Sequence, residues 1–350
     1  MRIFNPSVVI IDNDSLDFPI AKRFKKLYSD NPSTRYQEID HEDICFDQFQ
    51  PFPKTLVEMK STLVVTRRYG FAVEKVGEGT YDLASDYIFN VVTGCPNFCS
   101  YCMQLYTLQE VPYIAIYPDL ESAMKMIQGI CQTDERRPLI FELGNMADMV
   151  ELEPATGILS DVIRQWADTF DPEVQLQVVT KSDNVRNLLE LSPKGTVRVG
   201  ITLNLPEFID SYEKKTAPLE QRLSAIRELL AHGYRIHLIF APIFYREGVF
   251  SKYRELFKHV KKFLSDCRGF DESDVTIETL TFFHKKGGHH EILRHYPGVA
   301  EELMQYVECP EKQTYHERYY YPDKIFKELN SLLTECVETY FPKAQAKSIK

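Results

Sequence analysis

The chain has 350 residues, of which 44% are hydrophobic and 26% charged, and its formal net charge is −10. This length suits two average domains or one α/β barrel with an added flank, and the composition excludes collagen-like, low-complexity and largely disordered chains. The negative charge argues against a broad basic surface for nucleic acid, because phosphate binding needs clustered Lys and Arg. A local basic groove is still compatible with it.

No segment of the sequence predicts a signal peptide or a membrane span. The first apolar run, residues 8–11, ends at Asp12, and no stretch approaches the roughly 18 apolar residues of a membrane helix. We therefore expect a cytoplasmic protein with no membrane partner. Thiols stay reduced in that compartment, so the eight cysteines are not expected to form disulfides.

Residues 1–87 are predicted to form an N-terminal α/β flank. Residues 8–11 predict a short buried strand, and residues 18–28 predict a helix because their apolar side chains recur at helical spacing. The acidic stretch over residues 38–47 is predicted to be a loop.

From residue 88 onward, short apolar runs alternate with longer amphipathic ones. This alternation predicts a parallel sheet with right-handed crossovers. Six β units are too few for a closed (β/α)8 barrel and suit a partial (β/α)6 barrel, in which chemistry gathers at the C-terminal strand ends. The predicted strands cover residues 88–92, 139–143, 174–179, 197–204, 235–241 and 275–281.

The barrel is predicted to span residues 88–285, and a C-terminal helical extension to span residues 286–350. The extension contains a helix near residues 324–340 and ends in a basic tail. The predicted barrel helices cover residues 120–130, with Asp119 as N-cap, and residues 154–166, 183–190, 218–232 and 251–264.

Three of the cysteines, Cys95, Cys99 and Cys102, form a C-x3-C-x2-C motif directly after the first barrel strand. Three thiolates on one loop can hold three irons of a 4Fe–4S cluster and leave the fourth iron open to a small molecule, whereas electron-transfer clusters normally take four cysteines. The alternative is a structural zinc site with three Cys and one His. Zinc sites usually come as two separated pairs, but no second CxxC follows, and the nearest downstream histidine is His232.

A cysteine triplet at this place in a six-unit partial barrel resembles the radical S-adenosylmethionine (SAM) superfamily. Within that superfamily, residues 6–342 resemble the spore photoproduct lyase family. The segments that carry the resemblance are PSVVI at 6–10, DY at 86–87, TGC at 93–95, PYI at 112–114, VTK at 179–181, TLN at 202–204, TAPL at 216–219 with Arg222, API at 241–243, EG at 247–248 and YFP at 340–342.

The resemblance implies a carbon–carbon lyase that cleaves SAM reductively to a 5′-deoxyadenosyl radical. It implies that this radical reverses a thymine dimer made by ultraviolet light, the spore photoproduct, in DNA. The implied partners are UV-damaged DNA and a one-electron reductant such as flavodoxin or ferredoxin. The implied cofactors are SAM and a 4Fe–4S cluster held by the cysteine triplet.

SAM would then be bound at the C-terminal ends of the barrel strands. A cation and hydroxyl groups would orient its carboxylate, and an acidic residue, Glu142 or Asp148, would hold its amino group or ribose. Without the family context, a lysine at a strand end is as readily a solvated side chain. The resemblance assigns Lys181 and Thr202 to positions near SAM, with Asn204 beside them. Ala241 ends the fifth strand, where the backbone could approach the adenine, and Asp148 is a predicted SAM contact from its place after the second strand.

The sequence departs from the family at the residues that return a hydrogen atom to the repaired thymine. Asn145 aligns with the family's hydrogen-donor cysteine, and Met103 replaces the relay tyrosine that follows the third cluster cysteine. An amide N–H or a thioether cannot donate a hydrogen atom as a weak S–H bond can. Tyr101 keeps part of the relay and is the predicted catalytic residue.

A second departure concerns DNA. The family's Gly-Arg-Tyr motif, which engages lesion-bearing DNA, aligns its Arg and Tyr with Gln313 and Thr314. Two alternatives to the lyase therefore stay open: a diverged relative that performs radical SAM chemistry on another substrate, and a non-catalytic, zinc-stabilised binding protein.

Two further patterns near the end of the barrel have structural interpretations. The basic segment 284–290 could contact phosphates or bind a metal, but such a run is more often a solvated loop. The run Tyr319 to Tyr321 could stack on bases, although packing in the core is the commoner role.

Overall fold

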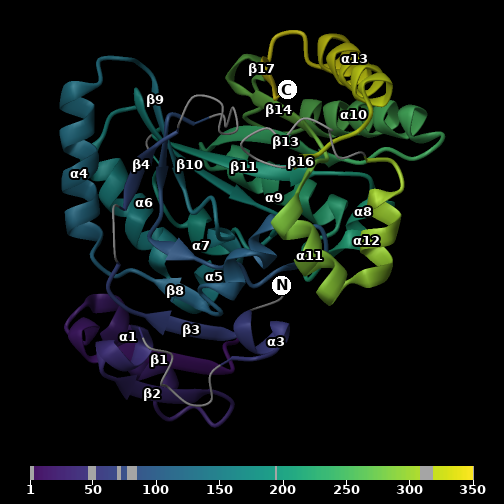
Figure 1. Ribbon diagram of the computed structural model, residues 1–350. Coiled ribbons are helices and arrows are strands. Elements are labelled where there is room, and N and C mark those ends of the chain that lie inside the picture. The colour runs from purple at the N-terminus through teal and green to yellow at the C-terminus, as the bar shows by residue number, and fades with distance from the viewer. Residues whose placement is uncertain are drawn as a thin grey trace.

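The computed structural model describes residues 4–45, 53–68, 72–76, 85–193, 195–307 and 318–349 (Figure 1). Within these residues two larger sheets carry the fold: one of eight strands in the order β17-β14-β13-β11-β10-β9-β5-β4 and one of five in the order β2-β1-β3-β8-β6. In Figure 1 the purple and blue strands of the five-stranded sheet lie below the larger sheet, and the yellow helix α13 (Asp323–Tyr340) lies on the opposite side.

The predicted α/β fold is confirmed in the larger sheet. All six predicted barrel strands are present, and each pairs in parallel with its neighbour along the chain. Every residue of the central strand β11 is buried, as expected for a parallel strand covered on both faces. The six strands are β5 (Tyr87–Phe89), β9 (Leu139–Leu143), β10 (Val174–Thr180), β11 (Val197–Leu203), β13 (Arg235–Ile243) and β14 (Thr276–Thr281).

Both edges of this sheet carry a strand that the sequence analysis did not predict. The basic tail forms β17 (Gln345–Ile349), which pairs in parallel with β14. At the other edge, β4 (Val73–Lys75) pairs antiparallel with β5.

Most of the predicted helices are confirmed. Asp119 caps the first of them, because its side chain accepts a hydrogen bond from the Ser122 amide over 3.0 Å. The confirmed barrel helices are α4 (Leu120–Thr133), α9 (Leu219–Ala231) and α10 (Val249–Ser265).

The predicted helix over residues 154–166 is wrong as one unit. It is two helices, α5 (Met149–Thr156) and α6 (Ile158–Thr169), separated by Gly157 in the left-handed conformation with φ 65°. The predicted helix at 183–190 is only a single turn, α7 (Arg186–Leu189).

The flank contains the predicted strand, β1 (Val8–Asp12), and the predicted helix, α1 (Pro19–Tyr28). The loop predicted over the acidic stretch is wrong, because β2 (Arg35–Ile39) pairs with β1 and α2 (His41–Cys45) follows. Polar residues are tolerated in β2 because it is an edge strand. The same sheet also contains β3 (Thr62–Val65), β6 (Val92–Thr93) and β8 (Ile114–Ile116), so it includes strands from beyond residue 87.

The C-terminal extension packs against the loop that carries the cysteines. The solvated loop predicted at 284–290 is wrong, since β15 (His284–Lys285) leads into α11 (Lys286–His295), and α12 (Pro297–Met304) follows. Ile292 of α11 and Ala300 of α12 are buried in one apolar cluster with Leu105 and Leu108. Among the described residues, no helix has the length and apolar character that a membrane crossing requires.

Candidate active site

The loop with Cys95, Cys99 and Cys102 is fixed at its start by Gly94. Gly94 has φ 92°, and a Cβ added to it would lie 2.9 Å from the carbonyl oxygen of Tyr113, so neither the conformation nor the space suits a side chain. Its amide also donates to the Met146 carbonyl over 3.1 Å, which ties the loop to the segment after β9.

The middle of the loop is held by a short antiparallel pairing. β7 (Phe98–Cys99) pairs with β12 (Glu213–Lys214), so that Cys99 lies opposite Glu213. After Cys102 the chain enters a 3-10 helix, η2 (Met103–Leu105). The cysteine loop is therefore fixed to a segment more than a hundred residues away in sequence.

Lys60 anchors the loop from the side of the flank, and sequence analysis did not identify it. It follows the short helix α3 (Leu56–Met59), and its buried ammonium donates to the carbonyl oxygens of Cys95 over 3.0 Å and Asn97 over 2.6 Å. The same ammonium lies 5.5 Å from the centre of the Phe98 ring. No motif marks this lysine, because its role depends on a contact between distant segments.

The three thiols lie close together, because charge on Cys102 acts on the pKa of Cys95, and charge on Cys102 and Cys95 acts on that of Cys99. Burial raises the pKa of Cys95 to about 12 and that of Cys99 well above its usual range, so a positive partner is required to stabilise the thiolates. Three free thiols on one fixed loop, near the cations of Lys60 and Lys181, fit a 4Fe–4S cluster as the resemblance implies.

Zinc remains the alternative for this loop. In the part of the chain that the structure describes, no group of three or more His, Cys, Asp or Glu side chains is arranged for a single metal ion. This finding concerns single-ion sites, and metal analysis is the direct test between zinc and iron.

The predicted SAM contacts meet at one edge of the sheet. Strands β10, β11 and β13 are neighbours, and they carry Lys181, Thr202, Asn204 and Ala241 at or just beyond their C-terminal ends. Asn204 is fully buried: it donates to the Pro242 carbonyl over 2.8 Å and accepts from the Leu205 amide over 2.9 Å. Its side chain therefore connects the ends of two neighbouring strands.

Asp148 connects the cysteine loop to the end of β10. One carboxylate oxygen accepts from the Asn97 side chain and from the Lys181 amide, each over 3.0 Å. The other accepts from the Thr180 hydroxyl over 2.6 Å and caps α5 through the Glu151 amide over 3.0 Å. Since both oxygens already have donors from this chain, the geometry favours a positioning role for Asp148 over direct contact with SAM.

Tyr101 donates a hydrogen bond of 2.5 Å to Glu213, which also forms a fully buried ion pair of 2.5 Å with Arg222. Burial opposes the charge on Glu213, but Arg222 and Lys181 outweigh it and lower the pKa of that carboxyl. Burial, and then Glu213, raise the pKa of Tyr101 well above its usual range. The phenol is thus held neutral and oriented by a carboxylate.

Lys181 lies next to this buried group. Burial alone would lower its pKa, but Glu213 and Cys99 raise it above the usual value. A protonated ammonium beside the cysteine loop can bind the carboxylate of a ligand. Sequence analysis identified Lys181 but missed Glu213, whose place opposite Cys99 depends on the β7–β12 pairing.

Asn145 lies in the turn after β9, next to η2. Its carbonyl oxygen accepts a hydrogen bond from Gln104 over 3.1 Å, so the positions of Asn145 and Met103 are on adjoining segments. The side-chain oxygen Oδ1 of Asn145 is buried and has no hydrogen-bond partner. Gln313 and Thr314 lie outside the described residues.

Tyr321 serves the core, as the commoner interpretation of the tyrosine run predicted. It is buried, packs against Phe282, and accepts a hydrogen bond from the Tyr245 amide over 2.8 Å. Tyr320 is more exposed, at 36%.

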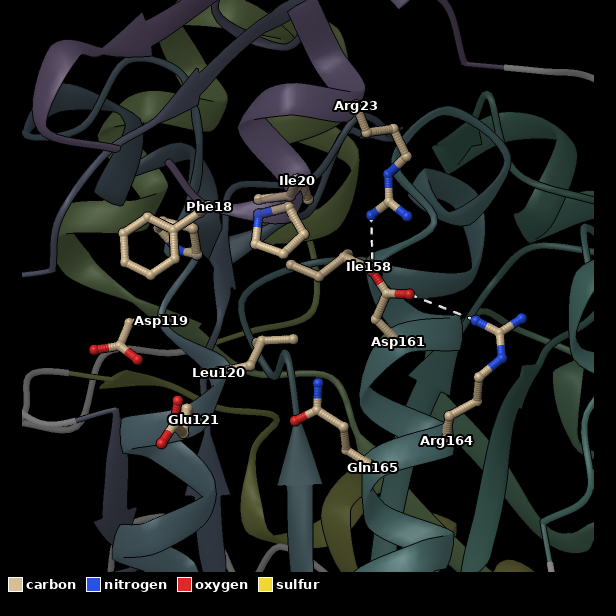
Figure 2. Close-up of a pocket in the computed structure, with 12 residues that line it drawn as sticks. Phe18, Ile20, Arg23, Asp119, Leu120, Glu121, Ile158, Asp161, Arg164 and Gln165 are labelled. Carbon is tan, nitrogen blue, oxygen red and sulfur yellow. Dashed lines mark hydrogen bonds and ion pairs between the residues drawn. The ribbon is translucent and has the colours of Figure 1, made fainter. Parts of the chain in front are cut away.

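A pocket of about 630 Å³ lies elsewhere, between the flank and the outer helices (Figure 2). Asp161 of α6 pairs there with Arg23 at 2.9 Å and Arg164 at 3.5 Å, beside the apolar side chains of Phe18 and Ile20. None of the site residues predicted from the sequence lines this pocket.

Comparison with known proteins shows one consistent likeness. The family model described as spore photoproduct lyase matches residues 4–349. The chain is 26% identical to a spore photoproduct lyase of Geobacillus sp. over 348 residues, covering 99% of this chain and 98% of that protein. It is 25% identical to that of Bacillus subtilis over 351 residues, covering 98% and 97% of the two chains.

Solved structures give the same result. A spore photoproduct lyase complexed with dinucleoside spore photoproduct is 25% identical, with a TM-score of 0.86 over 99% of this chain and 100% of that one. A variant with bound AdoMet and dinucleoside spore photoproduct is also 25% identical, with a TM-score of 0.85 over 99% of each chain.

Proposed function

Because this chain belongs to the spore photoproduct lyase family, we propose that it is a radical SAM enzyme that reverses the spore photoproduct in DNA to two thymines. The observation that carries the proposal is the site itself. A loop with three free cysteines is fixed at the C-terminal edge of a parallel sheet, beside the cation of Lys181.

Cys95, Cys99 and Cys102 would hold the cluster, and SAM would bind the iron that has no cysteine ligand. When bound, the cluster and SAM supply one-electron reductive cleavage and the hydrogen abstraction that follows. Lys181 binds the carboxylate of SAM, and Thr202, Asn204 and Ala241 line the adjoining strand ends. Asp148 positions this edge, because it joins Asn97 of the loop to the end of β10.

Tyr101 is the proposed catalytic residue of the chain. Its hydroxyl is aligned by Glu213, and its ring packs edge-on against Phe244 at 5.4 Å between centres. A phenol is neutral at pH 7, and burial and Glu213 raise the pKa of Tyr101 further, so its O–H bond is available to relay a hydrogen atom. Arg222 compensates the charge of Glu213 and so keeps this arrangement stable in a buried site.

The partners follow from the same chemistry. Cleavage of SAM consumes one electron, so we propose a one-electron reductant such as flavodoxin or ferredoxin, together with UV-damaged DNA as substrate. A cytoplasmic location is part of the proposal, because the cysteines must stay reduced to bind iron.

A second candidate function is radical SAM chemistry on a different substrate, and Asn145 is the observation that favours it. The buried Oδ1 of Asn145 lacks a partner, so it is suited to accept a hydrogen bond from a bound molecule. It cannot supply the hydrogen atom that the resemblance assigns to this position. Asn145 would then be a substrate-binding residue rather than a hydrogen donor.

Anaerobic reconstitution tests the first part of the proposal. We expect iron and sulfide in the purified protein and 5′-deoxyadenosine when SAM and dithionite are added. The variant with Cys95→Ala, Cys99→Ala and Cys102→Ala should lose both, whereas Cys131→Ala, a free cysteine on α4, should keep both. Zinc without iron would contradict the proposal and support a zinc-stabilised binding protein.

Incubation with dinucleoside spore photoproduct decides between the two enzymatic functions. Repeated turnover to the thymidine dinucleotide supports the lyase and requires a hydrogen donor other than Asn145. If 5′-deoxyadenosine forms but no repaired dinucleotide appears, the second candidate is supported.

A further inference from the structure

The hydroxyl of Tyr296 is a buried polar group without a partner. Tyr296 lies between α11 and α12, where it is the N-cap residue of α12 but does not cap it through its side chain. Its hydroxyl oxygen is buried and makes no hydrogen bond. An unpaired buried hydroxyl is unfavourable, so its presence in a native site calls for a specific reason.

The surroundings of Tyr296 suggest that reason. Its ring packs against the same small apolar cluster as Cys102, formed by Leu105 and Leu108 from the segment that follows the cysteines. Burial, and after it negative charge on Cys99 and Cys102, raise the pKa of Tyr296 to about 12. The phenol is a hydrogen-bond donor that packs against the same apolar cluster as Cys102 of the cysteine loop.

The position of the hydroxyl is fixed by the C-terminal extension. The Gln109 side chain, which follows η2, donates a hydrogen bond to Glu291 of α11. Ile292 and Ala300, on either side of Tyr296 in sequence, are buried against the same segment. The extension thus holds the phenol against the loop independently of any bound group.

Cluster binding would provide the missing acceptor. Iron binding converts cysteine thiols to thiolates, and thiolate sulfurs accept hydrogen bonds. Hydrogen bonds to the sulfurs are among the factors that set the reduction potential of an iron–sulfur cluster, because they stabilise the more negative, reduced state.

We propose that Tyr296 donates a hydrogen bond to the cluster thiolate of Cys99 or Cys102 and thereby raises the reduction potential of the cluster. The inference rests on the proposed function, since it requires the cluster. It makes Tyr296 a positioning residue that acts on electron transfer into the site, and it gives the C-terminal extension a role in tuning the cluster.

The test compares the wild-type protein with Tyr296→Phe and with the matched control Tyr306→Phe. Tyr306 belongs to the same extension but packs against Tyr245 at 5.1 Å between ring centres. Each protein is reconstituted anaerobically, its iron and sulfide are measured, and its midpoint potential is determined by a redox titration followed by electron paramagnetic resonance.

We expect Tyr296→Phe to bind iron and sulfide normally but to have a lower midpoint potential. At one fixed solution potential, the ratio of reduced to oxidised cluster should fall about tenfold. This ratio corresponds to a decrease in the midpoint potential of about 59 mV for a one-electron couple. Tyr306→Phe should match the wild type. Equal potentials in all three loaded proteins would overturn the inference and leave the proposed function intact, whereas a wild-type protein that binds no cluster would overturn both.

The cluster-free proteins give a second readout. Because the hydroxyl has no partner before the cluster binds, Tyr296→Phe should leave the melting temperature of the apoprotein unchanged or raise it. A clear decrease would show that the hydroxyl is bonded within the chain, and this would overturn the inference even if the potential also changed.

Discussion

The side-chain amide of Gln104 donates a hydrogen bond to the backbone carbonyl of Asn145 over 3.1 Å. This contact joins the 3-10 helix after the third cysteine to the turn after β9. It joins the segments that carry Met103 and Asn145, the two positions at which the sequence analysis predicts a departure from the family. The two positions therefore belong to one local structure beside the cysteine loop.

If the hydrogen donor is the missing element, Asn145→Cys should increase the yield of repaired dinucleotide severalfold, because it introduces a weak S–H bond in the turn. The measurement is the amount of thymidine dinucleotide formed per 5′-deoxyadenosine. Asn145→Ser is the control, since it is of similar size but lacks a weak bond to hydrogen. Equal yields from the two variants would show that position 145 does not donate hydrogen in this chain.

Lys60→Met should weaken the cysteine loop. The substitution leaves the buried carbonyl oxygens of Cys95 and Asn97 without their donor, at a cost of about 1–3 kcal/mol. We expect a lower melting temperature and less iron after reconstitution. Lys54→Met, in the same segment but exposed, should change neither. Normal iron content in Lys60→Met would mean that the lysine does not secure the loop.

Breaking the ion pair between Glu213 and Arg222 should lower the free energy of unfolding, and the losses from changing its two residues should not be additive. Glu213→Gln leaves a buried guanidinium without its counter-charge, and we expect a loss of about 3–5 kcal/mol in the free energy of unfolding. Arg222→Met also removes the donor to the carbonyl oxygens of Ala217 and Thr202, so it is destabilising by itself. The variant with both changes should lose less stability than the sum of the two single losses. Chemical denaturation of the wild type, the two single variants and the double variant measures the coupling, and fully additive losses would contradict a direct interaction.

The raised pKa of Glu142 predicts that the stability of the protein depends on pH. Burial, and then the neighbouring charge of Glu278, raise its pKa to about 7, against about 4.3 in an unfolded chain. A raised carboxyl pKa stabilises the fold fully below the unfolded value, and this contribution is lost as pH rises through about 7. Wild-type unfolding free energy should therefore fall between pH 5 and pH 8, by up to about 3 kcal/mol from this group.

Glu142→Gln removes that titration, so its unfolding free energy should change less between the two pH values. Glu121→Gln is the control, because Glu121 is exposed on α4 and should keep the wild-type slope. The same slope in Glu142→Gln and in the wild type would show that another group titrates.

The parts of the fold that were predictable from sequence are those that local pattern determines. Six apolar runs separated by amphipathic segments gave the order and the parallel pairing of the barrel strands, and the spacing of Cys95, Cys99 and Cys102 identified the centre of the site. Lys181 was predicted through the resemblance to the family, and the structure places it directly after β10, at the C-terminal edge of the sheet.

The parts that were missed depend on contacts between distant segments. Lys60 has no distinguishing neighbours in sequence, and Glu213 is defined only by its pairing with Cys99. The tail that forms β17 is basic and short, so its composition resembles a solvated end; only the free edge of β14 makes it a strand. The left-handed turn at Gly157 lies within an otherwise continuous helical pattern.

The pairing of β7 with β12 also has a consequence for the biosynthesis of the protein. The cysteines lie at residues 95–102, but the strand that fixes them includes Glu213, and the phenol beside them is at residue 296. A nascent chain that carries all three thiols still lacks the partners that position them until more than half of the protein has left the ribosome. Iron delivered before that point meets a loop that lacks the pairing with β12, so we expect the metal centre to assemble late in the synthesis of the chain or after it.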